Sequence, residues 1–162
     1  MGTISTAPPA DNRQKYENYK EQFRRLELAL KNHFYLEAAF IAYAIMEDRT
    51  ESILRHGSLY EAYLKSRGKR SETIDSKLRF IQKKAECKAD TLHKYFSDDL
   101  LEQILDWKND RNRLIHALLK QDLSTQTLQE MAVHGSELAK ELRTRVSRYN
   151  RVIDNHNKKV NI

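Results

Sequence analysis

The chain has 162 residues and a formal charge of +6, with four glycines, two prolines and one cysteine. This length suits one domain around a single core, and the scarcity of turn-forming residues predicts an all-α fold. One cysteine excludes an internal disulfide and a cysteine-rich metal site, as expected for a protein of the reducing cytoplasm.

The N-terminal half predicts a short lead and two long helices. Residues 1–12 are polar and contain both prolines, so we expect a disordered N-terminal lead. A first helix should follow and end near Lys31, because apolar residues recur there every three or four positions. A second helix, over about 34–56, has almost no polar face in its first half and should therefore lie at the centre of a bundle. Gly57 should end this helix.

The middle of the chain is basic. A short helix over 58–67 and a basic loop over 68–71 should precede a third major helix over about 72–88. Between Leu64 and Lys88 there are nine lysines or arginines against three acidic residues. A solvated helix face is the simpler interpretation of this segment, and a surface for nucleic acid is the alternative.

Two further helices complete the predicted fold. After a kinked connection, Ser97 should cap a helix that continues without glycine or proline to about Lys120. Ser124 should cap a final helix through about Asn155, whose apolar stripe repeats about every 3.5 residues. Such a stripe packs along another helix, either in this chain or in a second copy.

These elements predict one domain, an antiparallel up-and-down bundle of four to five main helices over residues 13–157. A basic C-terminal tail over 158–162 should follow it. The start lacks the basic and apolar regions of a signal peptide, and no apolar run is long enough to cross a bilayer. We therefore expect a cytoplasmic protein without a membrane partner.

The helix before Lys120 carries polar residues where its pattern calls for apolar ones. On a helical wheel, Arg111 falls in the apolar stripe of Trp107, and Asn112 falls in the adjoining apolar stripe. His116 lies one turn beyond Asn112, so these side chains can meet, and the long Arg111 side chain can lean toward them. A buried arginine without an acidic or phosphate partner is costly. The departure therefore indicates either a structural network or a functional site.

An arginine, an amide and an imidazole form a set that could cleave a phosphodiester bond. The guanidinium can hold a phosphate and offset the charge that develops on it, and an imidazole exchanges protons near neutral pH. RNA contains its own nucleophile, the 2′-hydroxyl, so the reaction would require no metal or cofactor and would leave a 2′,3′-cyclic phosphate. The sequence contains no glycine-rich phosphate loop, nucleophile elbow or histidines at metal-ligand spacing.

The run from Arg111 to His116 resembles the R-N-x-x-x-H signature of the HEPN (higher eukaryotes and prokaryotes nucleotide-binding) superfamily. The order of predicted elements over about residues 14–155 is also similar to that family. The resemblance implies an HEPN-like helical bundle and a metal-independent endoribonuclease of the toxin or antiphage type. It further implies RNA as substrate, a homodimer whose two motifs face one cleft, and an antitoxin, nucleotidyltransferase-like or other, as a further partner.

The resemblance also assigns roles to the motif residues. Arg111 would bind the scissile phosphate, His116 would act as general acid or base, and Asn112 would position His116 or the substrate. Family members often add a polar or acidic residue from an earlier helix, and Glu47 is the candidate because it continues the stripe of Phe40. A helix end that emerges into water, with Glu47 paired at the surface, is an equal alternative.

Two other interpretations of the motif stay open. One is a non-catalytic HEPN-like module that binds RNA or nucleotide, or that partners a nucleotidyltransferase. The other is a structural bundle in which the motif residues satisfy a network in the core. Arg151 and His156 repeat the bare spacing of arginine and histidine without the asparagine, so the spacing alone is weakly specific.

Overall fold

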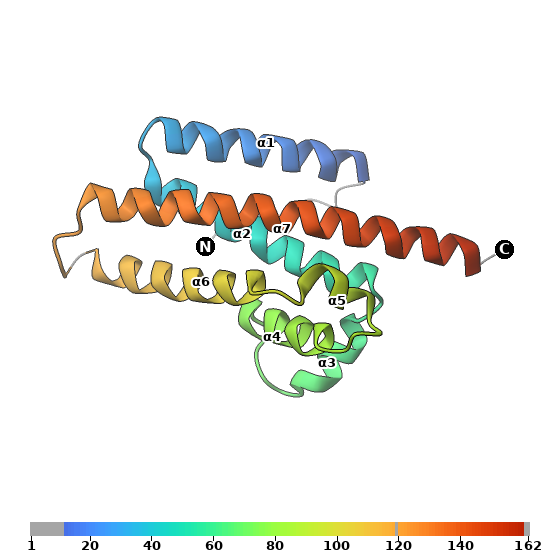
Figure 1. The fold of residues 1–162 in the computed structure, drawn as a ribbon. Helices are drawn as coiled ribbons and strands as arrows, with labels where there is room; N and C mark the ends of the chain where they lie inside the picture. The colour runs from blue at the N-terminus through green and yellow to red at the C-terminus, as the bar shows by residue number, and fades with distance from the viewer. Residues whose placement is uncertain (1–11, 119, 161–162) are drawn as a thin grey trace, which may run out of the picture.

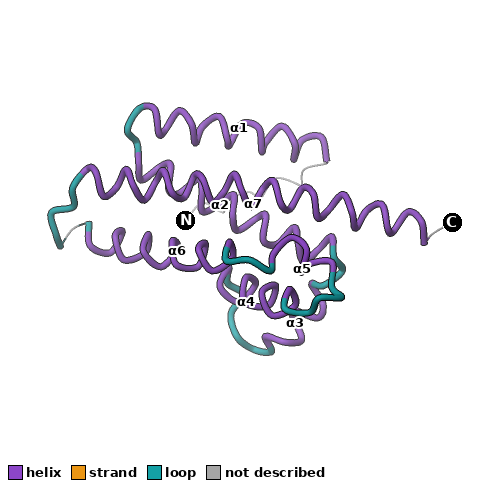
Figure 2. The backbone as a smooth tube through the Cα atoms, viewed as in Figure 1, coloured by secondary structure: helices purple, strands orange, loops and turns teal. Residues whose placement is uncertain are grey.

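The computed structural model describes residues 12–118 and 120–160, and every regular element in these residues is a helix. The predicted all-α class is therefore confirmed. Figures 1 and 2 show that the four long helices run alternately in opposite directions, whereas the three short ones gather on one side of the bundle. In chain order the helices are α1 (Asn12–Lys31), α2 (Tyr35–His56), α3 (Tyr60–Arg67), α4 (Ile74–Ala85), α5 (Thr91–Phe96), α6 (Leu100–Ala117) and α7 (Thr125–Val160).

Helix α2 lies at the centre of the bundle, as its apolar sequence predicts. It packs most extensively along α7 and also contacts α1, α3 and α4. The stripe predicted for the final helix faces this core, with Leu138, Leu142 and Val146 buried. The stripe of α7 therefore packs within this chain.

Ion pairs join the short helix α4 to the long helices α2 and α6. The Lys77 side chain of α4, although only 5% of the residue is exposed, lies 2.9 Å from carboxylate oxygens of both Glu51 and Glu72. The Lys77 ammonium lowers the pKa of both carboxyl groups through these hydrogen bonds. Lys108 of α6 contacts Asp75 of α4 at 2.6 Å. These pairs hold the start of α4 against both α2 and α6.

The start of α6 differs from the prediction. Ser97 does not cap this helix, because it ends α5, and Asp99 precedes Leu100 without a side-chain capping bond. The connection expected to be kinked contains α5, whose cap is Asp90. The Asp90 carboxylate accepts a hydrogen bond from the Leu92 N–H at 2.9 Å. The prediction missed α5 because a helix of six residues is too short to show a repeating apolar pattern.

The start of α7 agrees with the prediction, and its end lies further along the chain. The Ser124 hydroxyl accepts a hydrogen bond from the Thr127 N–H at 3.1 Å, which confirms the predicted cap. The helix continues past residue 155 to Val160. The predicted N-terminal lead lies outside the described residues, apart from Asn12.

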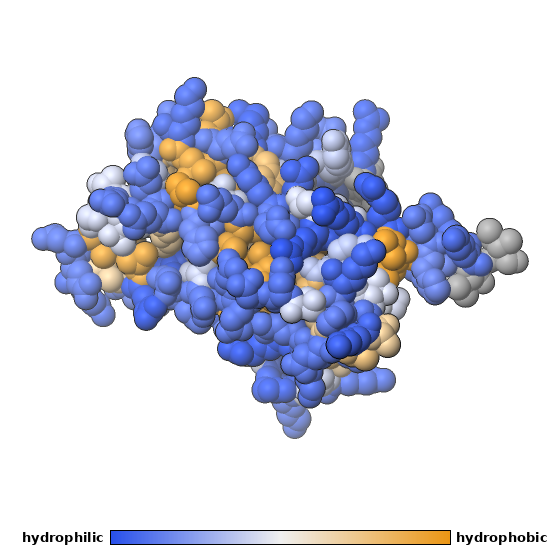
Figure 3. Space-filling view, in the orientation of Figure 1, coloured by the Kyte–Doolittle hydropathy of each residue, from blue (hydrophilic) through white to orange (hydrophobic). Residues whose placement is uncertain are grey.

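The surface combines a hydrophilic majority with local apolar patches. Figure 3 shows orange patches separated by blue side chains, some of them at the end of the molecule where α6 ends and α7 begins. Across the described residues, none of the helices combines the length and the apolar character that a membrane span requires.

Candidate functional site

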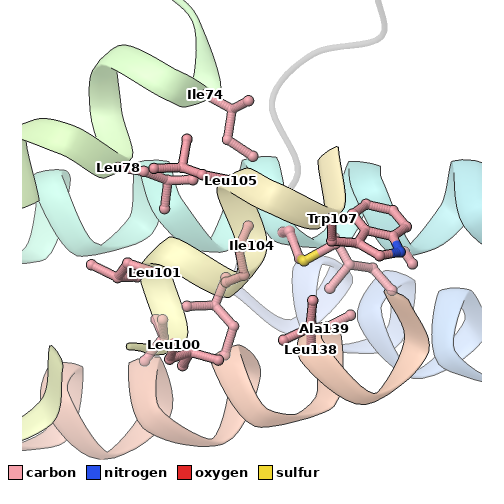
Figure 4. Close-up of a cluster of buried hydrophobic side chains, with 14 of the residues drawn as sticks. Ile74, Leu78, Leu100, Leu101, Ile104, Leu105, Trp107, Leu138 and Ala139 are labelled. Atoms are coloured by element: carbon pink, nitrogen blue, oxygen red, sulfur yellow. The ribbon is translucent and has the colours of Figure 1, made fainter. Parts of the chain in front are cut away.

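The first half of α6 is anchored in the core and so sets the position of the motif that follows. Five apolar residues of this half are buried: Leu100, Leu101, Ile104, Leu105 and Trp107. Figure 4 shows their side chains between α4 and α7. The Trp107 indole N–H donates a hydrogen bond to the Met131 carbonyl of α7 at 2.8 Å. A Cβ atom on Gly135 would lie only 2.3 Å from the Trp107 ring, so the absence of a side chain there allows this close packing.

The second half of α6 is less covered than the apolar pattern predicts. Leu114 and Leu118 are half-buried, and 38% of Ile115 is exposed. The pattern continues past Trp107, but the part of the chain that the structure describes does not bury these positions fully. The motif therefore lies where α6 leaves the core.

Arg111 is half-buried against α2. Its guanidinium carbon lies 4.8 Å from the centre of the Tyr43 ring, and its Nη1 donates a hydrogen bond to Asn112 Oδ1 at 3.1 Å. Its Nε is buried and has no partner among the described residues. Burial lowers the pKa of Arg111, and the neighbouring Tyr43 partly opposes this effect. Arg111 therefore carries the desolvation cost expected of an arginine in an apolar stripe, because no carboxylate among the described residues pairs with it.

Asn112 and His116 are exposed on the outer surface of α6. Both line a shallow pocket of about 710 Å³ on this face, together with Asp110 and Arg113. Asp110 pairs with Arg113, so that acid does not neutralise Arg111. Within the described residues, His116 has no hydrogen bond or ion pair. Asn112 therefore contacts Arg111 and shares a pocket with His116, whereas the structure shows no direct contact between Arg111 and His116.

The exposure of Asn112 and His116 argues against the interpretation of the motif as a core network. Such a network would bury the amide and the imidazole and satisfy their polar atoms. Of the three motif residues only Arg111 is half-buried, and its buried Nε has no partner among the described residues. The arrangement is that of a surface with one desolvated cation rather than a closed internal network.

Glu47 is exposed on α2, one turn beyond Tyr43. Burial raises the pKa of the Tyr43 hydroxyl, and the nearby Glu47 carboxylate adds to this increase. Among the described residues, Glu47 makes no ion pair or hydrogen bond, so the structure places it near the Arg111–Tyr43 contact without joining it to either side chain. The alternative of a surface ion pair for Glu47 is not seen in the described residues.

Tyr43 is the site residue that sequence reasoning missed. Its spacing of four residues from Glu47 places both side chains on one face of α2, and this is the available signal. Its contact with Arg111 joins two helices that lie far apart in the sequence, so helical periodicity could not reveal it. Among the residues that the structure describes, no three His, Cys, Asp or Glu side chains gather closely enough to hold a metal ion.

Comparisons of the chain with protein-family models, with curated proteins and with solved structures found no match. The functional interpretation of this site therefore rests on its own residues and geometry.

Proposed function

We propose that the chain is a metal-independent endoribonuclease of the HEPN type, acting as a homodimer in the cytoplasm. The observation that carries the proposal is the state of Arg111, a half-buried cation whose Nε has no partner. Its guanidinium contacts Asn112, which shares a pocket with His116. A desolvated guanidinium without a carboxylate keeps its hydrogen-bonding capacity for a phosphate.

In the proposed reaction the RNA supplies its own nucleophile. The 2′-hydroxyl gives its proton to a base and forms a bond to phosphorus, while the bond from phosphorus to the 5′-oxygen breaks. The departing 5′-oxygen takes up a proton, so the products are a 2′,3′-cyclic phosphate and a 5′-hydroxyl. Arg111 holds the non-bridging oxygens, and the exposed imidazole of His116 exchanges the protons. Asn112 positions the phosphate or His116. Glu47 is a supporting residue on the side of α2 that carries Tyr43.

The exposed apolar residues beside the motif support a homodimer. On α2, 64% of Phe40 is exposed, and Ile115 on α6 is 38% exposed. Phe40 lies one turn before Tyr43, and Ile115 lies one turn beyond Arg111. Since α2 and α6 run in opposite directions (Figure 1), the contact between Arg111 and Tyr43 places both apolar residues on the same side of it. A second copy that covered this area would bring two His116 imidazoles to one cleft, one as base and one as acid.

The biological setting of this proposal rests on the resemblance alone. A toxin or antiphage role would imply an antitoxin, nucleotidyltransferase-like or other, that blocks the cleft.

A binding module that does not cleave RNA is the second candidate. The specific observation in its favour is that His116 has no hydrogen-bond partner among the described residues. A general acid or base is most effective when a second group orients it. In this version Arg111 and Asn112 would hold a phosphate without its being cleaved.

The deciding experiment compares cleavage of a mixed RNA substrate by the wild type and by His116→Ala in EDTA. The matched control is His156→Ala, because His156 is exposed on α7 and follows Arg151 at the same spacing. We expect wild type and His156→Ala to produce 2′,3′-cyclic phosphate ends and His116→Ala to lose at least about a hundredfold in rate.

Each other outcome identifies what is wrong. Equal cleavage by all three proteins means that the activity resides elsewhere or in a contaminant. No cleavage by the wild type, with RNA still bound, favours the binding module. Circular dichroism of each variant excludes loss of folding as the cause.

A further inference from the structure

A basic pocket lies between α3 and α4, outside the site on α6. It encloses about 770 Å³, a volume within the range of about 300–1,000 Å³ typical of small-molecule sites. In Figure 1 these two helices lie side by side, away from the end of α6 that carries His116. Five cations line the pocket against one carboxylate: Arg67, Arg70, Arg79, Lys83 and Lys84 face it with Asp90.

None of the five pocket cations pairs with a carboxylate in the described residues, in contrast to the best-buried cations elsewhere in the fold. The buried Lys77 binds two carboxylates, and Lys108 and Arg145 each pair with an aspartate. By contrast, Arg79 and Lys83 have neither an ion pair nor a hydrogen bond in the described residues. The Asp90 carboxylate caps α5 and so is already engaged. The pocket therefore holds a local excess of positive charge, which attracts a polyanion.

Arg67 adds a buried donor to this charge. Its Nε is shielded from solvent and has no partner among the described residues. One of its terminal nitrogens donates to the Arg70 carbonyl, while Arg70 itself binds the carbonyls of Arg67 and Ser66 at the end of α3. The Arg67 and Arg70 side chains are thus held in place by backbone groups. A buried guanidinium nitrogen without an acceptor is unfavourable, so this position carries a desolvation cost that the described residues do not offset.

The remaining wall of the pocket is the half-buried Phe80 ring, supported from behind by Tyr63, which is only 1% exposed. Tyr63 and Phe80 pack edge to face with ring centres 5.7 Å apart, and the Lys84 ammonium lies 5.8 Å from the centre of the Phe80 ring. The Tyr63 hydroxyl is bonded to Ser76 at 2.7 Å, which holds this wall to α4. Inorganic phosphate would use only the cations. A ligand with both an anionic and a flat apolar part would use the whole pocket.

We propose that this pocket binds a nucleoside phosphate, as a second RNA-binding site apart from the motif on α6. Arg79 and Lys83 bind the phosphate, the Arg67 guanidinium adds to the positive charge beside it, and the ribose or base lies against the Phe80 ring. The same chemistry is present in a free nucleotide and in a strand of RNA. The assignment to RNA rests on the proposed function, whereas the affinity for a nucleoside phosphate does not.

The test measures binding of a fluorescein-labelled 2′-O-methyl RNA, which has no free 2′-hydroxyl and so cannot undergo the proposed cleavage. The pocket variant is Arg79→Gln with Lys83→Gln. The control is Arg148→Gln with Arg151→Gln, which removes the same charge from exposed, unpaired positions of α7. We expect roughly tenfold weaker binding by the pocket variant and a fall in the salt dependence of about 0.7 per lost contact, with little change in the control. Calorimetry with adenosine monophosphate then shows whether a single nucleotide is sufficient.

The outcomes separate the sources of the ligand. Binding of adenosine monophosphate that the pocket variant loses identifies a nucleotide site, and RNA binding without nucleotide binding identifies a site for a strand. The inference is overturned if wild type binds neither probe, or if the pocket variant weakens RNA binding no more than the control does. If this pocket binds the 2′-O-methyl RNA but the wild type does not cleave unmodified RNA in the assay of the preceding subsection, the proposed endoribonuclease is refuted and this inference stands.

Discussion

Arg111 and Arg145 show how differently two half-buried arginines are held in the same protein. Arg145 of α7 pairs with Asp98 and Glu141 and donates to the Tyr95 carbonyl. These partners raise the pKa of Arg145 against the effect of burial, whereas burial dominates and lowers the pKa of Arg111. The partners of Arg145 therefore offset its burial, whereas no carboxylate among the described residues offsets the burial of Arg111.

This contrast predicts that the same substitution has different effects on stability at the two positions. Arg111→Met should leave the free energy of unfolding within about 1 kcal/mol of the wild type, because methionine fills the same space without a desolvated charge. Arg145→Met should lower it by about 1–3 kcal/mol, because it leaves the Tyr95 carbonyl and two carboxylates without their donor. Urea unfolding measures both values. Equal destabilisation by the two variants would show that Arg111 has a structural role.

At the scale of the helices, the junction of α6 and α7 decides where the motif lies. Trp107 fits against the bare backbone at Gly135, and its indole N–H holds the Met131 carbonyl. Alanine in place of a helical glycine ordinarily stabilises a helix by about 1 kcal/mol. Here a Cβ would lie 2.3 Å from a rigid ring, so the packing should reverse the sign of this effect.

We therefore expect Gly135→Ala to lower the free energy of unfolding by about 1–3 kcal/mol through overpacking. In a Trp107→Leu background the same change should be neutral or stabilising, because the ring that it would meet is gone. A double-mutant cycle by urea unfolding measures this coupling. An equal loss from Gly135→Ala in both backgrounds would mean that the contact does not set the junction.

At the scale of the whole molecule, the proposed homodimer depends on the apolar area beside the motif. Phe40→Asp introduces a charge at a residue that is 64% exposed, so the fold of one chain should change in stability by less than about 0.5 kcal/mol. In a dimer interface the same charge would be buried without a partner, and the dimer should dissociate. RNA cleavage should be lost together with the dimer.

Leu28→Asp is the matched control, because Leu28 is also exposed, at 42%, but lies on α1. Light scattering coupled to gel filtration measures the mass of each protein. The dimeric form of the proposal would be contradicted if the wild type cleaves RNA at concentrations at which it is a monomer. Dissociation by both variants would place the interface elsewhere or extend it to α1.

The sequence by itself determined the helical class, the central place of α2, the buried stripe of α7 and the cap at Ser124. All of these follow from local rules, since a helix repeats every 3.6 residues and its first turn requires a polar cap. The same rules identified Arg111, Asn112 and His116 as departures from an apolar pattern. They failed at Ser97, because a good cap residue there ends α5 instead of starting α6.

Only the tertiary structure decided which way the motif faces. The apolar pattern predicted that Arg111 and Asn112 face inward. Because α6 leaves the core after Trp107, Arg111 is only half-buried, and Asn112 and His116 lie on the surface. The contact between Arg111 and Tyr43 and the basic pocket between α3 and α4 likewise depend on how separate helices meet. The physical reason is that periodicity defines the faces of one helix, whereas burial depends on which other helices cover those faces.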